Sequence, residues 1–441
     1  MIRLRRRRGP ARWWVLVAVV CTLVALAVIG LDHVRSFLPG GRDAGGVWLL
    51  TSSGPDDGAP ATGPTSSRTP PRTPSPTPAP PRDAVLTVVA GGDVLPHLPV
   101  NASARLTSGG YDFAPLLEPL RPWIAGADLA LCHLEVPVAP AGTAPSGYPA
   151  FGAPVELPAA LHATGWDGCS TASNHSLDRG LAGVDATLQA MDGAGLGHVG
   201  TARSAAEGAA PQVYELTRAD RTVRVAHLAA TYGVMGARPA SAPWAVTVVD
   251  TPALVQQAAA ARAAGADLVV VSIHCCQEYV TEPTAEQQRI AQELAASGQV
   301  DLVIGHHAHV PQPLVQLPGG PDGPGMWVAY GLGNMLSNQD AACCVAATDS
   351  GVLLTVTALV PAEGAVRVTG TTWTAVTVDR PGGHRVYPMP STVTSGALGT
   401  LTAAELAARY ERVRTAVGDQ APERVAPPAS SGPPPVVVPH P

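Results

Sequence analysis

Residues 301–310 read DLVIGHHAHV, a short apolar run that leads directly into three histidines within four positions. An apolar run of this length is typical of a buried strand. Histidine is the side chain that most commonly binds metals in proteins. The stretch predicts a strand whose carboxyl end carries His306, His307 and His309, either as metal ligands or as three imidazoles in a loop. The residues that follow the other strands decide between these two interpretations.

Strand-like and helix-like segments alternate along residues 83–418, and hydrophobic residues make up 46% of the chain, enough for a large core. Alternation of this kind predicts an α/β fold with a mostly parallel, buried sheet and helices on its faces. The runs near 351–379 are apolar at every second position, which suggests an antiparallel addition. We expect strands at 84–90, 128–134, 167–172, 222–230, 267–274, 301–306 and 326–332, and helices near 155–164, 181–194, 252–264 and 284–297.

Ligand-type side chains also follow the other expected strands. In an open α/β sheet the loops at the carboxyl ends of the strands converge on one crevice. Each side chain alone has a structural explanation, such as a turn, a helix start or a satisfied core histidine. Their agreement at successive strand ends favours a single site. They are, in chain order, Asp93, Glu135, Asn174, His175, His274 and Glu278.

Oxygen and imidazole donors in one site suit divalent Zn, Mn or Fe, and a carboxylate can bridge two ions. Two such ions about 4 Å apart, with water between them, are a common apparatus for hydrolysing phosphate esters. The adjacent pair Asn174 and His175 fits this chemistry, because the amide oxygen can bind an ion while the imidazole donates a proton.

The motifs GGD (91–93), HLE (133–135), SNH (173–175), HCCQEY (274–279), GHHAH (305–309) and YGLGN (330–334) follow one another in this order. As an ordered set they resemble the poly-γ-glutamate capsule biosynthesis protein family of CapA type, which is similar to calcineurin-like metallophosphoesterases. The resemblance covers residues 84–378. It implies a four-layer α/β/β/α sandwich with a metal site at the strand ends.

The resemblance also implies roles for single residues. Asp93 would bind one ion, Glu135 would bridge, and His307 and His309 would supply one imidazole to each ion. His175 would be the proton donor. The other implied residues are Asn174 and His274 as ligands of the second ion, and Asp178, which would orient His175.

Two positions depart from the pattern of these families. Leu95 stands where metallophosphoesterases have a histidine, and His133 stands where the capsule family usually has asparagine. The number of ions, one or two, is therefore open. Additional candidates for the site are His97, Glu278 and His306 as ligands, and Asn334 either as a substrate contact or as a turn residue.

The N-terminus has the pattern of a membrane anchor. Residues 1–12 are Arg-rich, and residues 13–31 are free of charge and long enough to span the roughly 30 Å of bilayer hydrocarbon. Flanking arginines stay cytoplasmic, so we expect a single-pass cell-membrane protein whose C-terminal domain is extracellular. A cleaved signal peptide is the alternative, although no small-x-small cleavage site closes the run convincingly. A Pro/Ser/Thr-rich linker (32–82), the folded domain (83–418) and a disordered Pro-rich tail (419–441) are expected to follow.

Charge and cysteine content limit the remaining possibilities. A net charge of -6 argues against binding to nucleic acid, which calls for a basic face. Every basic residue is Arg, a bias typical of a GC-rich bacterial genome. Six cysteines follow the apolar run, and we expect disulfides between the pair Cys275-Cys276 and the pair Cys343-Cys344.

Two functions of different kinds fit these observations. The first is a membrane-anchored extracellular metal-dependent hydrolase in the biosynthesis of a capsule polymer, an anionic polymer such as poly-γ-glutamate by resemblance. The second is a non-catalytic binding or assembly component of a capsule synthesis or export complex. A nucleotidase-like phosphoesterase that scavenges phosphate outside the cell is a third possibility.

Overall fold

The computed structural model describes residues 82–321 and 325–441. The predicted Arg-rich end, membrane anchor and nearly all of the linker lie outside these residues. Within the described part of the chain, no helix combines the length and apolar character needed to cross a membrane.

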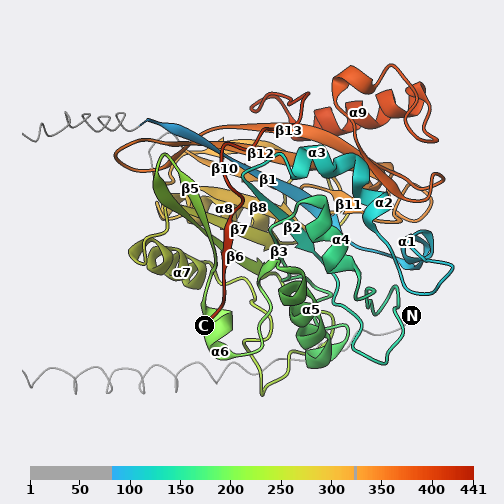
Figure 1. The fold of residues 1–441 in the computed structure, drawn as a ribbon, viewed down its shortest axis with the longest axis horizontal. Helices are drawn as coiled ribbons and strands as arrows, with labels where there is room; N and C mark the ends of the chain where they lie inside the picture. The colour runs from blue at the N-terminus through green and yellow to red at the C-terminus, as the bar shows by residue number, and fades with distance from the viewer. Residues whose placement is uncertain (1–81, 322–324) are drawn as a thin grey trace, which may run out of the picture. The chain divides into compact units, whose positions relative to one another are not determined.

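Two sheets form the framework of the fold (Figure 1). In the first, β1 to β4 run parallel to one another, and β12, β13 and β14 continue the sheet beyond β1, each antiparallel to the strand before it. Its order is β14 (Arg385–Pro388), β13 (Arg367–Asp379), β12 (Ser350–Val360), β1 (Ala84–Val94), β2 (Leu129–Leu134), β3 (Gly168–Ser170) and β4 (Gly197–Val199), with β11 (Asn334–Leu336) beside the end of β1.

The second sheet has a parallel centre and antiparallel edges. Its order is β15 (Val436–Val438), β5 (Gln212–Arg218), β6 (Arg221–Thr231), β7 (Leu268–His274), β8 (Leu302–His306), β10 (Met326–Ala329) and β9 (Leu314–Leu317).

The sheets share a core, and helices cover their outer faces. Successive side chains of a strand point to opposite faces, so Leu86 and Val88 of β1 face the second sheet while Val89 packs on the helix side. Both faces of β1 are buried, which explains its almost continuous apolar run. The outer helices are α2 (Ala114–Leu117), α3 (Arg121–Ile124) and α4 (Leu157–Thr164) on the first sheet, and α7 (Thr251–Ala263) and α8 (Ala285–Ala296) on the second.

The predicted elements are confirmed at the level of existence and type. Every expected strand overlaps an observed one, the expected helices correspond to α4, α5 (Gly180–Ala194), α7 and α8, and β12 with β13 is the expected antiparallel addition. The capping box at the start of α8 is present, with Thr284 and Gln287 bonded reciprocally. The sequence did not predict the strands of three or four residues at 197–199 and 314–317, or α9 (Ala403–Val417), which packs on β12 and β13.

The prediction of a disordered tail at 419–441 is wrong. Val436–Val438 adds to the second sheet beside β5, and the main chain and side chain of Ser431 donate hydrogen bonds to Asp128. Asp128 forms a fully buried ion pair with Arg218 at 2.7 Å. A buried carboxylate needs several donors, and the tail supplies them. The proline content of the tail prevents it from forming a core of its own, but it does not prevent the tail from packing on the folded domain.

The disulfide prediction is also wrong. Cys132 and Cys169 are paired across neighbouring strands β2 and β3, which bring them into register, and Cys275 is joined to Cys276. The pair Cys343 and Cys344 carries free thiols. Strand pairing between residues 37 positions apart decides which thiols meet, and spacing in the sequence does not encode it.

Candidate metal centre

The carboxyl ends of parallel strands from both sheets meet at one buried place. The first sheet and its loops contribute Asp93, Glu135, Asn174 and His175, and the second contributes His274, His306, His307 and His309. All of these side chains are buried. Asp93 reaches the site because the main chain passes close by β11: its N–H donates to Gly333 O at 2.8 Å, and a Cβ at Gly92 would collide with the same carbonyl.

Glu135 is the clearest indication of a missing partner. Its side chain is fully buried, and neither carboxylate oxygen has a hydrogen-bond partner among the described residues. Oε1 lies 3.6 Å from His309 Nε2 and 3.9 Å from His274 Nε2. Burial raises the pKa of Glu135 to about 7. A buried carboxylate without donors is costly, and a divalent cation held between it and these imidazoles would supply the missing interaction.

Asp93 lies on the opposite side of His309. Its Oδ1 is 3.3 Å from His306 Nδ1, and its Oδ2 is 3.1 Å from His309 Nδ1. Burial favours the neutral form, but the adjacent imidazoles of His306 and His309 hold the pKa of Asp93 far below its usual value. Asp93 is therefore a carboxylate at neutral pH, as a ligand must be.

Asn174 and His274 form a second close pair, with 2.9 Å between Asn174 Oδ1 and His274 Nε2. Burial lowers the pKa of His274 well below its usual value and that of His307 to about 3. His307 Nδ1 has no hydrogen-bond partner within the described ranges. Neutral imidazoles with accessible lone pairs are the form that binds metals.

The loop after β8 turns sharply to place its imidazoles. His307 and His309 have φ angles of 83° and 56°, in the left-handed region that residues other than glycine seldom adopt. Such conformations cost of order 1–3 kcal/mol each and persist where the surroundings hold them, typically at functional sites. In a continuing strand, successive side chains would point to opposite faces. The turn instead lets both imidazoles face Glu135 and Asp93.

His175 and Asp178 form a dyad at the edge of this centre. His175 Nδ1 lies 2.7 Å from Asp178 Oδ2, which also accepts a hydrogen bond from Phe151 N at 2.8 Å. Burial opposes protonation of His175, but Asp178 and the charge of Glu135 raise its pKa overall. The geometry matches a protonated imidazole oriented by a carboxylate.

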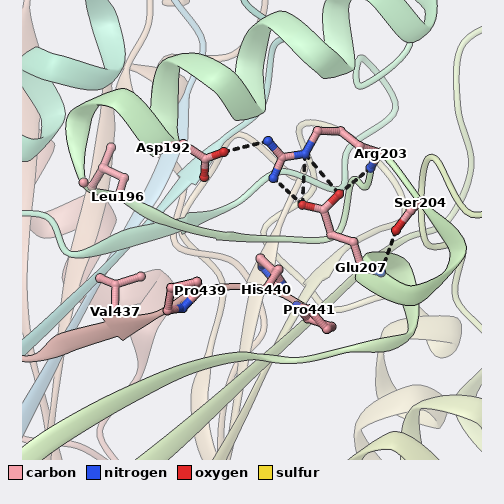
Figure 2. A pocket seen from close by; sticks show the side chains of 10 residues that line it. Asp192, Leu196, Arg203, Ser204, Glu207, Val437, Pro439, His440 and Pro441 are labelled. Atoms are coloured by element: carbon pink, nitrogen blue, oxygen red, sulfur yellow. Dashed lines mark hydrogen bonds and ion pairs between the residues drawn. The ribbon is translucent and has the colours of Figure 1, made fainter.

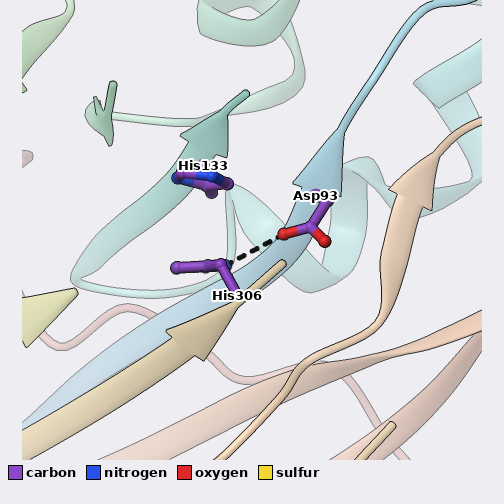
Figure 3. Close-up of side chains that lie close together, drawn as sticks. All are labelled: Asp93, His133 and His306. Atoms are coloured by element: carbon purple, nitrogen blue, oxygen red, sulfur yellow. Dashed lines mark ion pairs between the residues drawn. The ribbon is translucent and has the colours of Figure 1, made fainter. Parts of the chain in front are cut away.

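His133 belongs to this centre although the sequence indicated it only as a departure from a pattern. Its Nε2 is 2.9 Å from His274 Nδ1, its Nδ1 is 2.8 Å from Ser170 Oγ, and its ring stacks on His306 with 4.0 Å between centroids. Figure 3 shows His133 and His306 beside Asp93. Ligand-type atoms of these three residues lie within 4.8 Å of one another, but both nitrogens of His133 are already engaged. One signal was available: residue 135 directly follows β2 and lies two positions after residue 133, so strand alternation predicts the same face for both.

The additional candidates take different places. His97 Nδ1 lies 3.0 Å from Leu95 O, and burial lowers its pKa to about 4. Glu278 Oε1 lies 3.9 Å from His309 Nε2 on a side chain that is 38% exposed. Neither belongs to a group of potential ligands in the described part of the chain. Leu95 is buried in the outer core of the first sheet.

Asn334 is buried beneath His309. Its Oδ1 lies 3.1 Å from His309 Nδ1, and its Nδ2 donates to Gln339 Oε1 and Thr348 O. The side chain thus orients a candidate ligand. A metal-binding histidine almost always has its second nitrogen bonded in this way.

A second group of ligand-type residues lies elsewhere, beside a pocket of about 610 Å³ (Figure 2). Ligand atoms of His198, Glu207 and His440 lie within 4.8 Å of one another. Here a guanidinium occupies the position where a cation would sit: Arg203 donates to Glu207 Oε1 at 2.5 Å and to Asp192 Oδ2 at 2.6 Å. The positive charge is already present, so this group does not require a metal.

Comparisons with known proteins agree with the motif order. A family model described as bacterial capsule synthesis protein PGA_cap matches residues 87–339, more than half of the chain. Capsule biosynthesis protein CapA of Bacillus anthracis is 29% identical over 184 residues, which cover 41% of this chain and 42% of that protein. PGA biosynthesis protein CapA of Bacillus subtilis (strain 168) is 28% identical over 172 residues, 38% of this chain and 42% of that protein. The match thus spans less than half the length of these curated relatives.

Solved structures match at lower similarity. The calcineurin-like phosphoesterase YfkN from Bacillus subtilis aligns with a TM-score of 0.39 and 15% identity over 67% of this chain and 91% of that chain. The NAD nucleotidase NadN of Haemophilus influenzae aligns with a TM-score of 0.39 and 12% identity over 75% and 60%. The family assignment comes from the sequence match: this chain belongs to the family of bacterial capsule synthesis proteins PGA_cap.

Proposed function

We propose that this chain is a membrane-anchored extracellular protein of capsule polymer biosynthesis with a metal-dependent hydrolase site of phosphoesterase type. The polymer is anionic, and poly-γ-glutamate is the candidate that the family suggests. The observation that carries the hydrolase proposal is Glu135, a fully buried carboxylate that has no hydrogen bond within the described part of the chain and faces His274 and His309.

The donor set fits divalent Mn, Zn or Fe, since it combines carboxylates, one amide oxygen and imidazoles. Bound there, the metal would polarise the bond to be cleaved and lower the pKa of a bound water. A set of six candidate ligands would hold one ion or two. The residues that would hold it are Asp93, Glu135, Asn174, His274, His307 and His309, with His306 next to Asp93.

His175 would act on the substrate directly. Its raised pKa keeps the imidazole protonated to higher pH than a free histidine, and Asp178 holds Nδ1 so that Nε2 carries the transferable proton. The proton would pass to the oxygen or nitrogen that leaves when the bond breaks. Phe151 packs edge-on against the His175 ring with centroids 4.8 Å apart and restricts its movement.

Metal analysis of the full chain purified in detergent tests the proposal. We expect a bound transition metal that is lost in the double variant His307→Ala, His309→Ala and retained in His162→Ala, which removes an exposed histidine on α4. The same preparations would be assayed with phosphodiester and γ-glutamyl substrates. A folded wild-type chain that binds no metal at neutral pH would refute the hydrolase proposal.

The alternative is a non-catalytic assembly component of a capsule synthesis or export complex. Leu95, in place of a ligand histidine, is the residue that favours it. Cells that carry His175→Ala separate the two: sustained polymer production at normal protein level supports assembly, and lost production with an intact metal site supports catalysis.

A further inference from the structure

A continuous row of polar atoms crosses from the first sheet to the second beside the metal centre. Ser170 Oγ lies 2.8 Å from His133 Nδ1, and His133 Nε2 lies 2.9 Å from His274 Nδ1. His274 Nε2 then lies 2.9 Å from Asn174 Oδ1. Every contact in this row joins two buried side chains. Each contact therefore depends on a proton that one of its two groups carries.

The last contact fixes the protons when no cation is present. Asn174 Oδ1 is only an acceptor, so His274 Nε2 must carry the hydrogen that joins them. A neutral His274 then accepts at Nδ1, His133 must donate from Nε2, and Ser170 must donate its hydroxyl proton to His133 Nδ1. Each of the three contacts in the row then has one proton between its two atoms.

A cation bound by His274 Nε2 and Asn174 Oδ1 requires the opposite arrangement, because Nε2 must then offer a lone pair. His274 would carry its proton on Nδ1 and donate to His133 Nε2, and His133 would donate from Nδ1 to Ser170 Oγ. Each imidazole still has one proton, so the reversal needs no net gain or loss. A main-chain carbonyl in the place of His133 could accept but never donate, and would permit only one of the two states.

We propose that His133 is a positioning residue that, together with Ser170, allows the His274 tautomer fixed by Asn174 to reverse when a metal binds. The metal-bound half of this inference rests on the proposed function, whereas the metal-free half does not. The ring is held in place for this role by its stacking on His306, at 4.0 Å and 16°, and by the register of β2 with β3, which pairs residue 133 with residue 170.

The test uses solid-state nitrogen spectra of full chain labelled with ¹⁵N-histidine, in which His274→Gln identifies the His274 signals. In metal-free protein we expect His274 protonated on Nε2, and after addition of Mn²⁺ or Zn²⁺ protonated on Nδ1. His133→Phe retains a stacking ring without nitrogens, so His274 should stay protonated on Nε2 in the metal-free protein and should lack a partner for an Nδ1 proton when metal binds. Metal affinity should fall about 10–100-fold, the usual effect of removing an outer partner of a ligand histidine.

Two further variants guard against misfolding of His133→Phe. His133→Gln can both donate and accept, so its metal affinity should stay close to that of the wild type. Ser170→Ala keeps the ring and removes only the far end of the row. His274 protonated on Nδ1 in the metal-free wild type, or an unchanged metal affinity in His133→Phe, would overturn the inference. A wild-type chain that binds no metal would refute the proposed function, while the metal-free spectra would still decide whether Asn174 fixes the tautomer.

Discussion

Two clusters in this molecule contain similar residue types and differ in whether their carboxylates have hydrogen-bond donors. At the metal centre, the Glu135 oxygens have no hydrogen bond among the described residues. At the pocket around Glu207, both carboxylates are bonded to Arg203, and only the Nδ1 atoms of His198 and His440 lack partners there. Histidines and carboxylates in proximity therefore do not by themselves indicate a metal. A fully buried carboxylate without a hydrogen-bond donor does, because a proton or a cation must neutralise it.

Each cluster also contains a histidine paired with an aspartate. The two pairs differ in the exposure of the aspartate and in the direction in which the pKa of the histidine is shifted. Asp178 is 3% exposed and raises the pKa of His175 despite burial. Asp192 is 49% exposed and shared with Arg203, and burial together with His440 lowers the pKa of His198. Only the first pair can keep a proton ready for transfer near neutral pH.

The largest difference is expected between two single variants, His175→Ala and His198→Ala. His175→Ala should slow hydrolysis of an unactivated phosphodiester by about 10²–10⁴-fold, the usual contribution of a general acid. The loss should be smaller for a 4-nitrophenyl ester, whose leaving group needs no proton, and bound metal should be unchanged. His198→Ala should leave turnover at the wild-type level. Equal losses in both variants would remove the functional distinction between the two pairs.

The next effect concerns the two glutamates. Glu135→Gln removes the central charge and should lower metal affinity by more than the roughly 100-fold seen on losing an outer partner. Glu207→Gln is the matched change in the other cluster and should leave bound metal unchanged. Chelator competition with Mn²⁺ and Zn²⁺ measures both. A Glu135→Gln chain that binds metal normally would contradict the assignment.

The stability of the metal-free chain should depend on pH through the same residues. The pKa of Glu135 is raised to about 7 and that of His309 to about 10, so at these two residues the folded state binds more protons than the unfolded state. His274 and His307 act in the opposite direction below about pH 6.5, because burial lowers their pKa. The contribution of Glu135 to stability should fall as pH rises from about 4.5 to about 7, by on the order of 3 kcal/mol. The difference in thermal unfolding between the wild type and Glu135→Gln measures this contribution, and its pH dependence should shrink with Mn²⁺. A difference that does not change with pH would show that Glu135 has its usual pKa.

The smallest effect tests the reason for the difference between the clusters. Arg203→Met removes the guanidinium, which is about one-third exposed, and should destabilise the fold by about 1–2 kcal/mol after allowance for that exposure. In a Glu135→Gln background it should also allow weak Zn²⁺ binding by His198, Glu207 and His440. Zn²⁺ stoichiometry of the double variant measures this. No uptake would mean that the geometry of the pocket, and not Arg203, excludes metal.

Much of the centre was predictable because its residues follow strands that local patterns identify. Asp93, Glu135, Asn174 and His274 each stand at the carboxyl end of an expected strand, and parallel strands bring those ends together. Asn334 and His133 could not be assigned in the same way. Asn334 reaches His309 from 25 positions away, and His133 reaches His274 from 141 positions away in the other sheet.

The sequence by itself determined the alternation of strands and helices, the capsule family and the set of ligand-type side chains, since these depend on local periodicity and motif order. Only the tertiary structure decided which charges are compensated. Arg203 neutralises one cluster and leaves Glu135 in the other without a donor, Ser431 of the tail satisfies Asp128, and strand register joins Cys132 to Cys169. The physical reason is that hydrogen bonds and ion pairs act over a few ångströms, between residues whose separation along the chain carries no signal.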